Sequence, residues 1–214
     1  MQFDEIHYIA IEGVIGVGKT SLANLLTKHL EGTLLLEKFD ENPFLPDFYR
    51  DPKRYAFQTQ LFFLLNRFRQ QQDLMQRELF DERIISDYLF AKDRIFASVT
   101  LQDRELALYD KVATLLEKDI PRPDLVIYLQ SSPERLMQNI TRRGRQYEKW
   151  ITVEYIHTLN EAYNNYFFYY KLTPLLVINS IEIDFVNDKE DTEDILQQIK
   201  HPRLGTTYYS PKKK

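Results

Sequence analysis

The sequence predicts an α/β fold in which five parallel strands form one sheet, with helices packed on both faces. Three observations lead to this prediction. Five short apolar runs are bounded by turn-forming residues, as buried strands are. The segments between them carry apolar residues at helical spacing, and such alternation produces a parallel sheet. A glycine-rich turn separates the first run from the first helical segment. The expected strands are Tyr8–Ile11, Thr33–Leu36, Arg83–Asp87, Asp124–Leu129 and Leu175–Ile178.

The glycine-rich turn fits the phosphate-binding pattern Gly-x-x-x-x-Gly-Lys-Ser/Thr at every fixed position. Its backbone N–H groups converge on phosphate oxygens, and the following helix N-terminus adds positive potential. Lys19 brings a full charge to the outer phosphates, and the Thr20 hydroxyl is a ligand for Mg²⁺. A turn that binds nothing is the alternative, but it leaves the Lys and Thr in register unexplained. We therefore expect ATP or another triphosphate, held by Gly13, Val14, Ile15, Gly16, Val17, Gly18, Lys19, Thr20 and Ser21.

Length and composition narrow the class of protein. The 214 residues suit one domain, taken as residues 1–200, with a flexible tail from 201 to 214 where Pro, Gly, Ser and Lys accumulate. The net charge of -4 offers no basic face to a nucleic acid polymer. No apolar run reaches membrane-spanning length, and the first residues lack an apolar signal core. The absence of cysteine is compatible with a reducing compartment, so we expect a cytoplasmic protein without a membrane or nucleic acid partner.

The second strand delivers Glu37 to its carboxyl end, which is the edge where open α/β sheets bind ligands. A long helix is then expected from about Arg54 to Phe80. On one strip of its surface Gln60, Phe63 and Arg67 recur at helical spacing, so an amide and a guanidinium flank an aromatic ring. The strip could line a pocket for a planar polar ligand or simply face water, and the spacing favours neither.

The third strand ends in Asp87, and a carboxylate at that place is a common neighbour of Mg²⁺ in nucleotide-binding sheets. Helices are expected from about Leu89, carrying Asp93, and from Asp103 to Glu117. After the fourth strand, Ser132-Pro133-Glu134 begins a helix that ends in Arg142-Arg143-Gly144-Arg145. These arginines could be a solvated helix end, but beside a phosphate site a mobile clamp is the better interpretation.

The C-terminal part contains an aromatic helix from about Val153 to Leu172, whose rings we assign to the core or to a subunit interface rather than to a ligand. A homodimer is expected on that basis. After the last strand, residues Glu182 to Asn187 form a loop, and Asp191 or Thr192 caps a final helix through Ile199.

These features together resemble the deoxyribonucleoside kinase family, specifically its bacterial deoxyadenosine and deoxyguanosine kinase branch. The resemblance covers Ile6 to Ile199. It rests on the phosphate loop, on Glu37 followed by Glu41-Asn42-Pro43-Phe44-Leu45 and Phe48-Tyr49, on Gln60 with Arg67, on Asp93 before Ile95-Phe96-Ala97, and on the arginine-rich segment. It implies the P-loop NTPase fold with an arginine-rich lid, ATP and Mg²⁺ as cofactors, and transfer of phosphate to a deoxyribonucleoside.

The resemblance also implies roles for single residues. Glu37 is the expected general base at the nucleoside 5′-hydroxyl, although the acid matching Asp87 has also been given that role, so both stay open. Mg²⁺ is expected at Thr20 and Asp87. The expected partners of the sugar and base are Tyr49, Gln60, Arg67, Asp93 and Glu148, those of the phosphates Lys19, Arg143 and Arg145, and those of adenine Asp184 and Phe185 in the loop from Glu182 to Asn187.

The chain departs from the family pattern at two places. The family commonly has Asp/Glu-Arg-Ser after the third strand, where this chain has Asp87-Tyr88-Leu89. The missing arginine normally helps to hold the base carboxylate, so the local hydrogen bonding must differ here. A second lid arginine position is occupied by Asn139.

The sequence therefore predicts ATP-dependent 5′-phosphorylation of a deoxyribonucleoside, deoxyadenosine being favoured, in deoxynucleotide salvage. One alternative is a nucleoside monophosphate kinase of the thymidylate type, which needs extra cationic groups for the acceptor phosphate; none is expected near Glu37. A second alternative is a catalytically silent nucleotide-binding subunit, which has no reason to keep Lys19, Glu37 and the lid arginines together.

Overall fold

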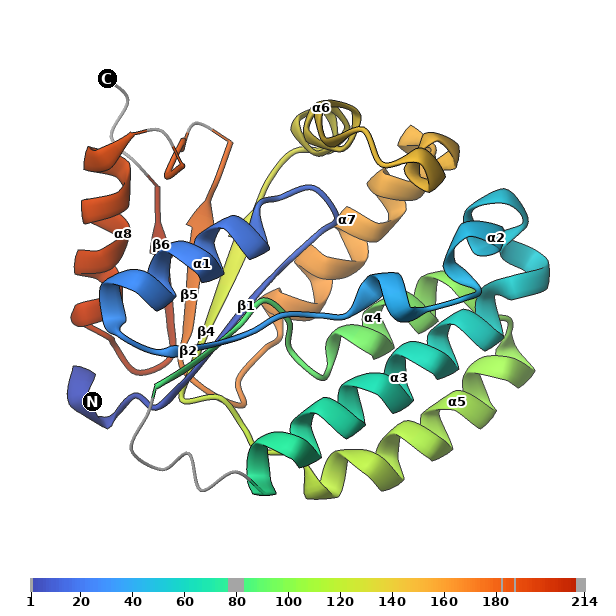
Figure 1. The fold of residues 1–214 in the computed structure, drawn as a ribbon, viewed down its shortest axis with the longest axis horizontal. Coiled ribbons are helices and arrows are strands. Elements are labelled where there is room, and N and C mark those ends of the chain that lie inside the picture. The colour runs from blue at the N-terminus through green and yellow to red at the C-terminus, as the bar shows by residue number, and fades with distance from the viewer. Residues whose placement is uncertain (1, 77–82, 182, 187, 211–214) are drawn as a thin grey trace.

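The computed structural model describes residues 2–76, 83–181, 183–186 and 188–210 and has a central parallel sheet between two layers of helices (Figure 1). The strand order is β2-β3-β1-β4-β5-β6. Helices α1 and α8 lie on one side of the sheet, and α4 and α7 lie on the other. The strands are β1 Tyr8–Gly13, β2 Thr33–Leu35, β3 Ile84–Ser86, β4 Leu125–Gln130, β5 Leu175–Asn179 and β6 Thr206–Tyr209.

The sheet has six strands, so the prediction of five was wrong. The sixth, β6, lies inside the segment from 201 to 214 that was expected to be a flexible tail, and it pairs in parallel with β5 from Leu175↔Thr206 to Ile178↔Tyr209. Gly205 turns the chain into this strand with a positive φ of 79°. The strand is short and half exposed, and its residues do not form an apolar run, which is why it resembles a tail in sequence. Residues 211–214 lie outside the described part of the chain.

The helices are α1 Lys19–Leu30, α2 Leu45–Arg50, α3 Pro52–Gln76, α4 Lys92–Thr100, α5 Asp103–Leu116, α6 Pro133–Arg143, α7 Val153–Phe168 and α8 Lys189–Lys200. Short 3₁₀ turns lie at Phe3–Glu5, Phe39–Glu41, Glu117–Asp119 and Gln146–Trp150. Within the described ranges, no helix is long and apolar enough to cross a membrane.

Several helix boundaries differ from the prediction for local reasons. The helix expected from Leu89 begins at Lys92, because the Leu89 amide is hydrogen-bonded to the Glu12 carboxylate. Helix α8 is capped by Asp188, which accepts hydrogen bonds from two amides of the first turn, so capping by Asp191 or Thr192 was wrong. Helix α7 ends at Phe168 rather than Leu172. For the helix expected to reach Phe80, the last four residues lie outside the described part of the chain.

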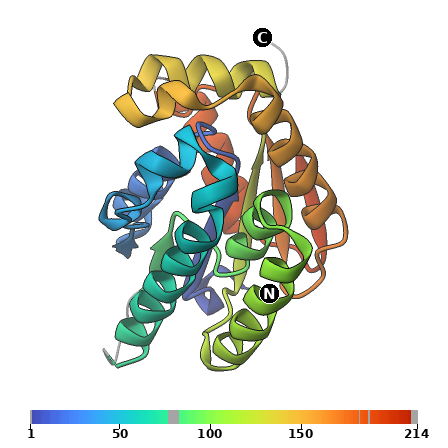
Figure 2. The same ribbon diagram turned by 90° about the vertical axis from the view of Figure 1, so that its right-hand side faces the viewer.

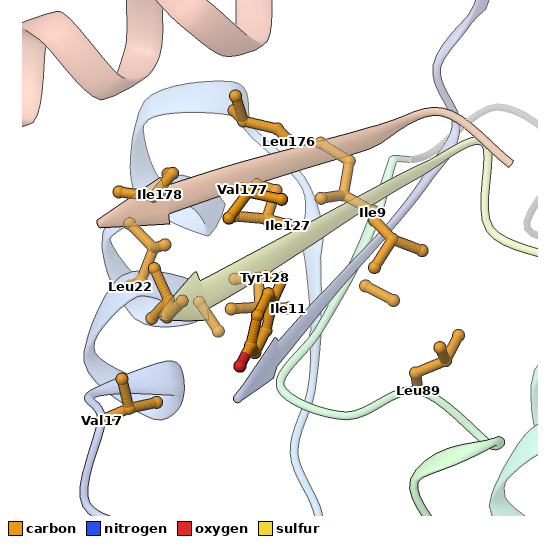
Figure 3. Packing of buried hydrophobic residues seen from close by; sticks show 14 of the residues in the cluster. Ile9, Ile11, Val17, Leu22, Leu89, Ile127, Tyr128, Leu176, Val177 and Ile178 are labelled. Atoms are coloured by element: carbon orange, nitrogen blue, oxygen red, sulfur yellow. The ribbon is translucent and has the colours of Figure 1, made fainter. Parts of the chain in front are cut away.

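Two clusters of buried side chains hold the fold together. The larger one surrounds β1, β4 and β5, and Figure 3 shows Leu22 of α1 and Val17 of the glycine-rich turn packed against it. Val14 and Val17 are both buried, so two side chains of that turn are fixed in the core. The smaller cluster joins α2, α3, α4 and α5 through Phe48, Leu64 and Tyr109 among others. Figure 2 shows these helices grouped beside the sheet, and residues of α2, α3 and α4 line the site described below.

Candidate active site

The glycine-rich turn connects β1 to α1, as the sequence predicts. Gly16 and Gly18 have φ values of 85° and 105°, which a residue with a side chain adopts only with strain. At Gly16 a Cβ would also lie 2.9 Å from the Leu136 carbonyl oxygen, so α6 packs directly on the turn. Lys19 is the first residue of α1 and donates from Nζ to the carbonyls of Gly13 at 2.7 Å and Val14 at 3.2 Å. The turn thus presents backbone amides and an ammonium group at a helix N-terminus, which suits phosphate.

Thr20 and Asp87 meet beside this turn. The Thr20 hydroxyl donates to Asp87 Oδ2 at 2.6 Å, and the backbone N–H of Glu37 donates to Asp87 Oδ1 at 2.7 Å. The ends of β2 and β3 are thereby joined to α1. Hydroxyl and carboxylate oxygens are ligands that Mg²⁺ accepts, together with substrate phosphates, so these residues fit that ion. Among the described residues, no group of three or more His, Cys, Asp or Glu could hold a metal without such help.

Glu37 follows β2, and its carboxylate is held by two cations from different helices. Arg67 of α3 contacts Oε1, and Lys92 of α4 contacts Oε2. Burial would raise the pKa of Glu37, but Arg67 and Lys92 outweigh it and hold that pKa well below its usual range. Glu37 is therefore ionised at neutral pH. Arg67 was expected in this site, whereas Lys92, 55 residues from Glu37 along the chain, is an extra cation beside Glu37 that was not expected.

Arg67 bridges Glu37 to Asp93, and both Arg67 and Asp93 are almost fully buried, at 3% and 1% exposure. Burial would lower the pKa of Arg67, but the Glu37 carboxylate raises it, so the guanidinium stays charged. Within the described residues, Asp93 Oδ2 and Arg67 Nε have no hydrogen-bond partner. Arg67 lines the cavity described next, whereas Asp93 stands behind it. The structure thus brings the two predicted residues together in one ion pair.

A cavity opens on one side of Glu37 and collects most of the residues expected to bind a nucleoside. Gln60, Phe63 and Arg67 of the polar strip all line it, so that strip does not face water. Tyr49 lies on the opposite wall, where Tyr147 stacks on it at 6.1 Å between ring centroids, and burial raises the pKa of Tyr49 well above its usual value. The wall also contains Leu45, Phe48, Phe96 and Glu148. An amide, a guanidinium and several rings in one cavity suit a planar polar ligand.

Two residues of the arginine-rich segment, Arg143 and Arg145, line this cavity. Arg143, at the end of α6, and Arg145 both contact the carboxylate of the buried Glu148, and the Arg145 guanidinium lies 3.9 Å from the Phe39 ring centroid. Asn139, at the other lid position, donates to the Gly16 carbonyl at 2.9 Å and so fixes α6 to the glycine-rich turn. Glu148 therefore holds the lid arginines in addition to lining the cavity.

A second cavity adjoins the first and shares the lid residues Arg143 and Arg145 with it. It is lined by Gly16 to Ser21, by Asp184 and Phe185, and by four basic or amide side chains of α6. Gly13, Val14 and Ile15 do not line it, although Ile15 lines the first cavity. Of the loop expected near adenine, Glu182 and Asn187 lie outside the described residues. The two cavities share Gly16, Lys19, Thr20, Glu37, Phe39, Asp87, Arg143 and Arg145.

Sequence reasoning missed several residues of this site. Arg135 lines the second cavity with Asn139 and Arg142, and its position four residues before Asn139 on α6 was a detectable signal. Lys92 lines the first cavity, but in the sequence it is one lysine directly before Asp93 and belongs to no motif. Glu12 was visible as an acid inside an apolar strand: it is fully buried, burial raises its pKa, and it accepts hydrogen bonds from Gly13 N, Leu89 N and Tyr163 Oη at 2.8, 2.9 and 3.2 Å.

Comparison with known proteins agrees with this geometry. The family model described as deoxynucleoside kinase matches residues 9–202. A deoxyguanosine kinase of Bacillus subtilis is 36% identical over 90% of this chain and 96% of its own length. A deoxyadenosine kinase of Dictyostelium discoideum is 39% identical over 90% of this chain and 78% of its own length.

Solved structures give the same result. Deoxyadenosine kinase from M. mycoides with bound dCTP superimposes with a TM-score of 0.79 at 28% identity, over 91% of this chain and 99% of that one. The sheet flanked by helices and the glycine-rich turn are those of the P-loop NTPases. On the match to the family model and on these relatives, the chain belongs to the deoxynucleoside kinase family.

Proposed function

We propose that this enzyme transfers the γ-phosphoryl group of ATP to the 5′-hydroxyl of a deoxyribonucleoside, with deoxyadenosine as the favoured acceptor, in deoxynucleotide salvage. The observation that carries the proposal is the junction of the two cavities at Lys19, Glu37 and Asp87. A triphosphate in the second cavity and a nucleoside in the first would meet there. Phosphoryl transfer depends mainly on such positioning and on neutralisation of charge.

In the proposed reaction Glu37 accepts the hydroxyl proton, and Lys19, Arg143 and Arg145 stabilise charge on the phosphates. Mg²⁺, held by Thr20, Asp87 and the phosphates, would supply further positive charge. Glu37 is preferred to Asp87 as the base because Asp87 accepts a hydrogen bond from Thr20, the other residue expected at Mg²⁺. The carboxylate of Glu37 is held instead by Arg67 and Lys92, which line the first cavity and not the second. The choice is tested below by replacing each carboxylate.

The nucleoside base would lie against Gln60, Phe63 and Arg67. Gln60 is 2% exposed and presents an amide that can both donate and accept, as paired hydrogen bonds to a base require. Asp93 does not line the cavity, but it pairs with Arg67, which does, and one of its carboxylate oxygens lacks a partner among the described residues. A base whose exocyclic amine reached this oxygen would satisfy it, which favours an amino-bearing base. The deoxyadenosine preference itself rests on the relatives, which include a deoxyadenosine kinase from D. discoideum.

A nucleoside monophosphate kinase is the main competing function, because Arg67 and Lys92 do place cations beside Glu37. These two positive charges are matched by the two negative charges of Glu37 and Asp93. The cluster is therefore neutral and offers no net attraction to an acceptor phosphate. This charge balance supports a neutral nucleoside as the acceptor.

The proposal also includes a cytoplasmic homodimer. Its support is the end of α7, where Phe168 and Tyr169 are 71% and 68% exposed beside Leu172 at 60%. The absence of cysteine suits a reducing compartment. Sedimentation of the wild type and of a Phe168→Asp variant tests the dimer: a wild-type monomer would contradict it.

The experiment for the reaction is an assay with ATP and Mg²⁺ against all four deoxynucleosides and their monophosphates, with products separated by chromatography. We expect 5′-monophosphates from deoxynucleosides, with the highest kcat/KM for deoxyadenosine. Turnover of monophosphates alone would favour the competing kinase. A folded protein that binds ATP and turns over none of the eight acceptors would be the silent subunit.

A further inference from the structure

We infer that Lys92 is a positioning residue for Glu37. The inference rests on the proposed phosphoryl transfer and assigns one more residue to it. Lys92 is the first residue of α4, 55 residues from Glu37 along the chain, and its Nζ lies 2.5 Å from Glu37 Oε2.

The placement of Lys92 is unfavourable for the fold. Its side chain is buried, with 5% exposure, and lysine is among the residue types least often buried. It also stands at a helix N-terminus, where the helix dipole disfavours a cation. An apolar residue there would avoid both costs, so the position of Lys92 calls for an explanation beyond packing.

The contacts supply that explanation. Glu37 has two carboxylate oxygens: Arg67 contacts one and Lys92 the other, so the group is fixed from two sides. The Arg67 guanidinium is shared with Asp93, whereas Lys92 has one ion-pair partner among the described residues, Glu37. The Phe96 ring, 5.5 Å from Nζ, lies beside the ammonium group. Lys92 thus orients the oxygen that Arg67 does not reach.

Lys92 also lies where the two substrates would meet. It lines the nucleoside cavity together with Lys19, Thr20 and Asp87 of the phosphate side. A carboxylate that rotates freely at this place would seldom present its oxygen to the acceptor hydroxyl. Loss of Lys92 should therefore lower kcat and leave nucleoside binding, which depends on Gln60 and Arg67, nearly unchanged.

The test uses the absence of cysteine from the chain. In Lys92→Cys the only thiol is at the position of interest, and alkylation in denaturant followed by refolding modifies that site alone. The thiolate displaces bromide from 2-bromoethylamine and leaves an aminoethyl side chain that reproduces lysine. The same thiolate displaces iodide from iodoacetamide and leaves a neutral amide of similar length. Wild-type protein passes through both treatments as a control.

Lys92→Met and Arg94→Met form the matched pair of substitutions. Arg94 is two residues further along α4 and forms a more exposed ion pair with Glu117, so its loss removes a cation from the same helix outside the cavity. We expect Lys92→Met to lower kcat on the order of 100-fold with KM for deoxyadenosine changed less than about threefold, and Arg94→Met to change neither by more than about twofold. The aminoethyl form should recover most of the wild-type kcat, and the amide form should not.

Two results would overturn the inference. One is a Lys92→Met kcat equal to that of Arg94→Met; the other is equal activity of the aminoethyl and amide forms. Folding of each form is checked by its ATP-induced rise in Tm, and if Lys92→Met does not fold, the two alkylated forms decide the question. Failure of the proposed function looks different, because wild type and Arg94→Met would then be inactive as well.

Discussion

Raising the pH should weaken ATP binding, because the phosphate-binding lysine loses its charge at an unusually low pH. Burial and the neighbouring charge of Lys92 lower the pKa of Lys19 from 10.5 to about 8. Phosphate oxygens bound at Lys19 would favour its charged form. The protein must therefore take up a proton to bind ATP once the pH exceeds that pKa.

The magnitude follows from the pKa. With a value of about 8, Lys19 is about nine-tenths charged at pH 7 and about one-tenth charged at pH 9. The apparent dissociation constant for ATP should rise about tenfold over this interval, which corresponds to about 1.4 kcal/mol. The stability of the ATP-free protein should change in the opposite direction. Because the pKa of Lys19 is lower in the folded protein than in the unfolded chain, the free energy of unfolding should rise between about pH 8 and 10.5.

The assay is calorimetric titration with ATP at pH 7, 8 and 9 and constant ionic strength. Lys19→Arg is the matched control, because its guanidinium stays charged throughout and so reports the titration of every other group. Lys19→Met, which has no titrating group at this position, should bind more weakly with the same pH dependence as Lys19→Arg. If wild type and Lys19→Arg lose affinity in parallel, the assignment of the low pKa to Lys19 is refuted.

Three further predictions use the same deoxynucleoside assay. Glu37→Gln should lower kcat about 100-fold or more while changing nucleoside affinity little, since it keeps the shape of the side chain but removes the proton acceptor. If Glu37→Gln keeps its kcat and Asp87→Asn loses it, the general base is Asp87. Replacing Arg67 and Asp93 together by small apolar residues should relax the preference for amino-bearing bases over thymine, because an unpaired buried acceptor costs about 1–3 kcal/mol; unchanged kcat/KM ratios among the four deoxynucleosides would contradict this. Gly16→Ala should raise the dissociation constant for ATP with little change for deoxyadenosine, because its Cβ would meet the Leu136 carbonyl at 2.9 Å; equal ATP affinity, measured by calorimetry, would show that the turn adapts.

Local patterns were enough to predict five of the six strands, the glycine-rich turn and the acids at the strand ends. Lys19, Thr20, Glu37 and Asp87 are fixed by their places in the first three strand-to-helix connections, so their meeting at one edge follows from a parallel sheet. Spacing alone placed Gln60 and Arg67 on one strip, but only the packing of α3 against the sheet decides that the strip faces a cavity.

Partners distant in sequence could not be predicted in the same way. The pairing of Glu37 with Lys92 depends on the start of α4 at Lys92. That start depends in turn on the hydrogen bond from the Leu89 amide to the buried Glu12 carboxylate. The ion pair between Glu148 and Arg143 forms because Glu148 lies in a short 3₁₀ turn, and no periodic pattern of apolar residues in the sequence predicts that turn. These contacts set the charge balance of the site. A search for cationic residues close to Glu37 in sequence therefore did not find Lys92.

The sixth strand has a practical consequence for handling the protein. Its partner β5 has four consecutive buried apolar residues, Leu175 to Ile178, and β6 occupies the backbone groups along the outer side of that strand. A chain cut before Gly205 would present β5 as an open, apolar edge, able to pair with the same edge of another molecule. We therefore expect residues 205–210, though they resemble a dispensable tail in sequence, to protect the protein from aggregation, and a purification tag is better placed at the other end of the chain.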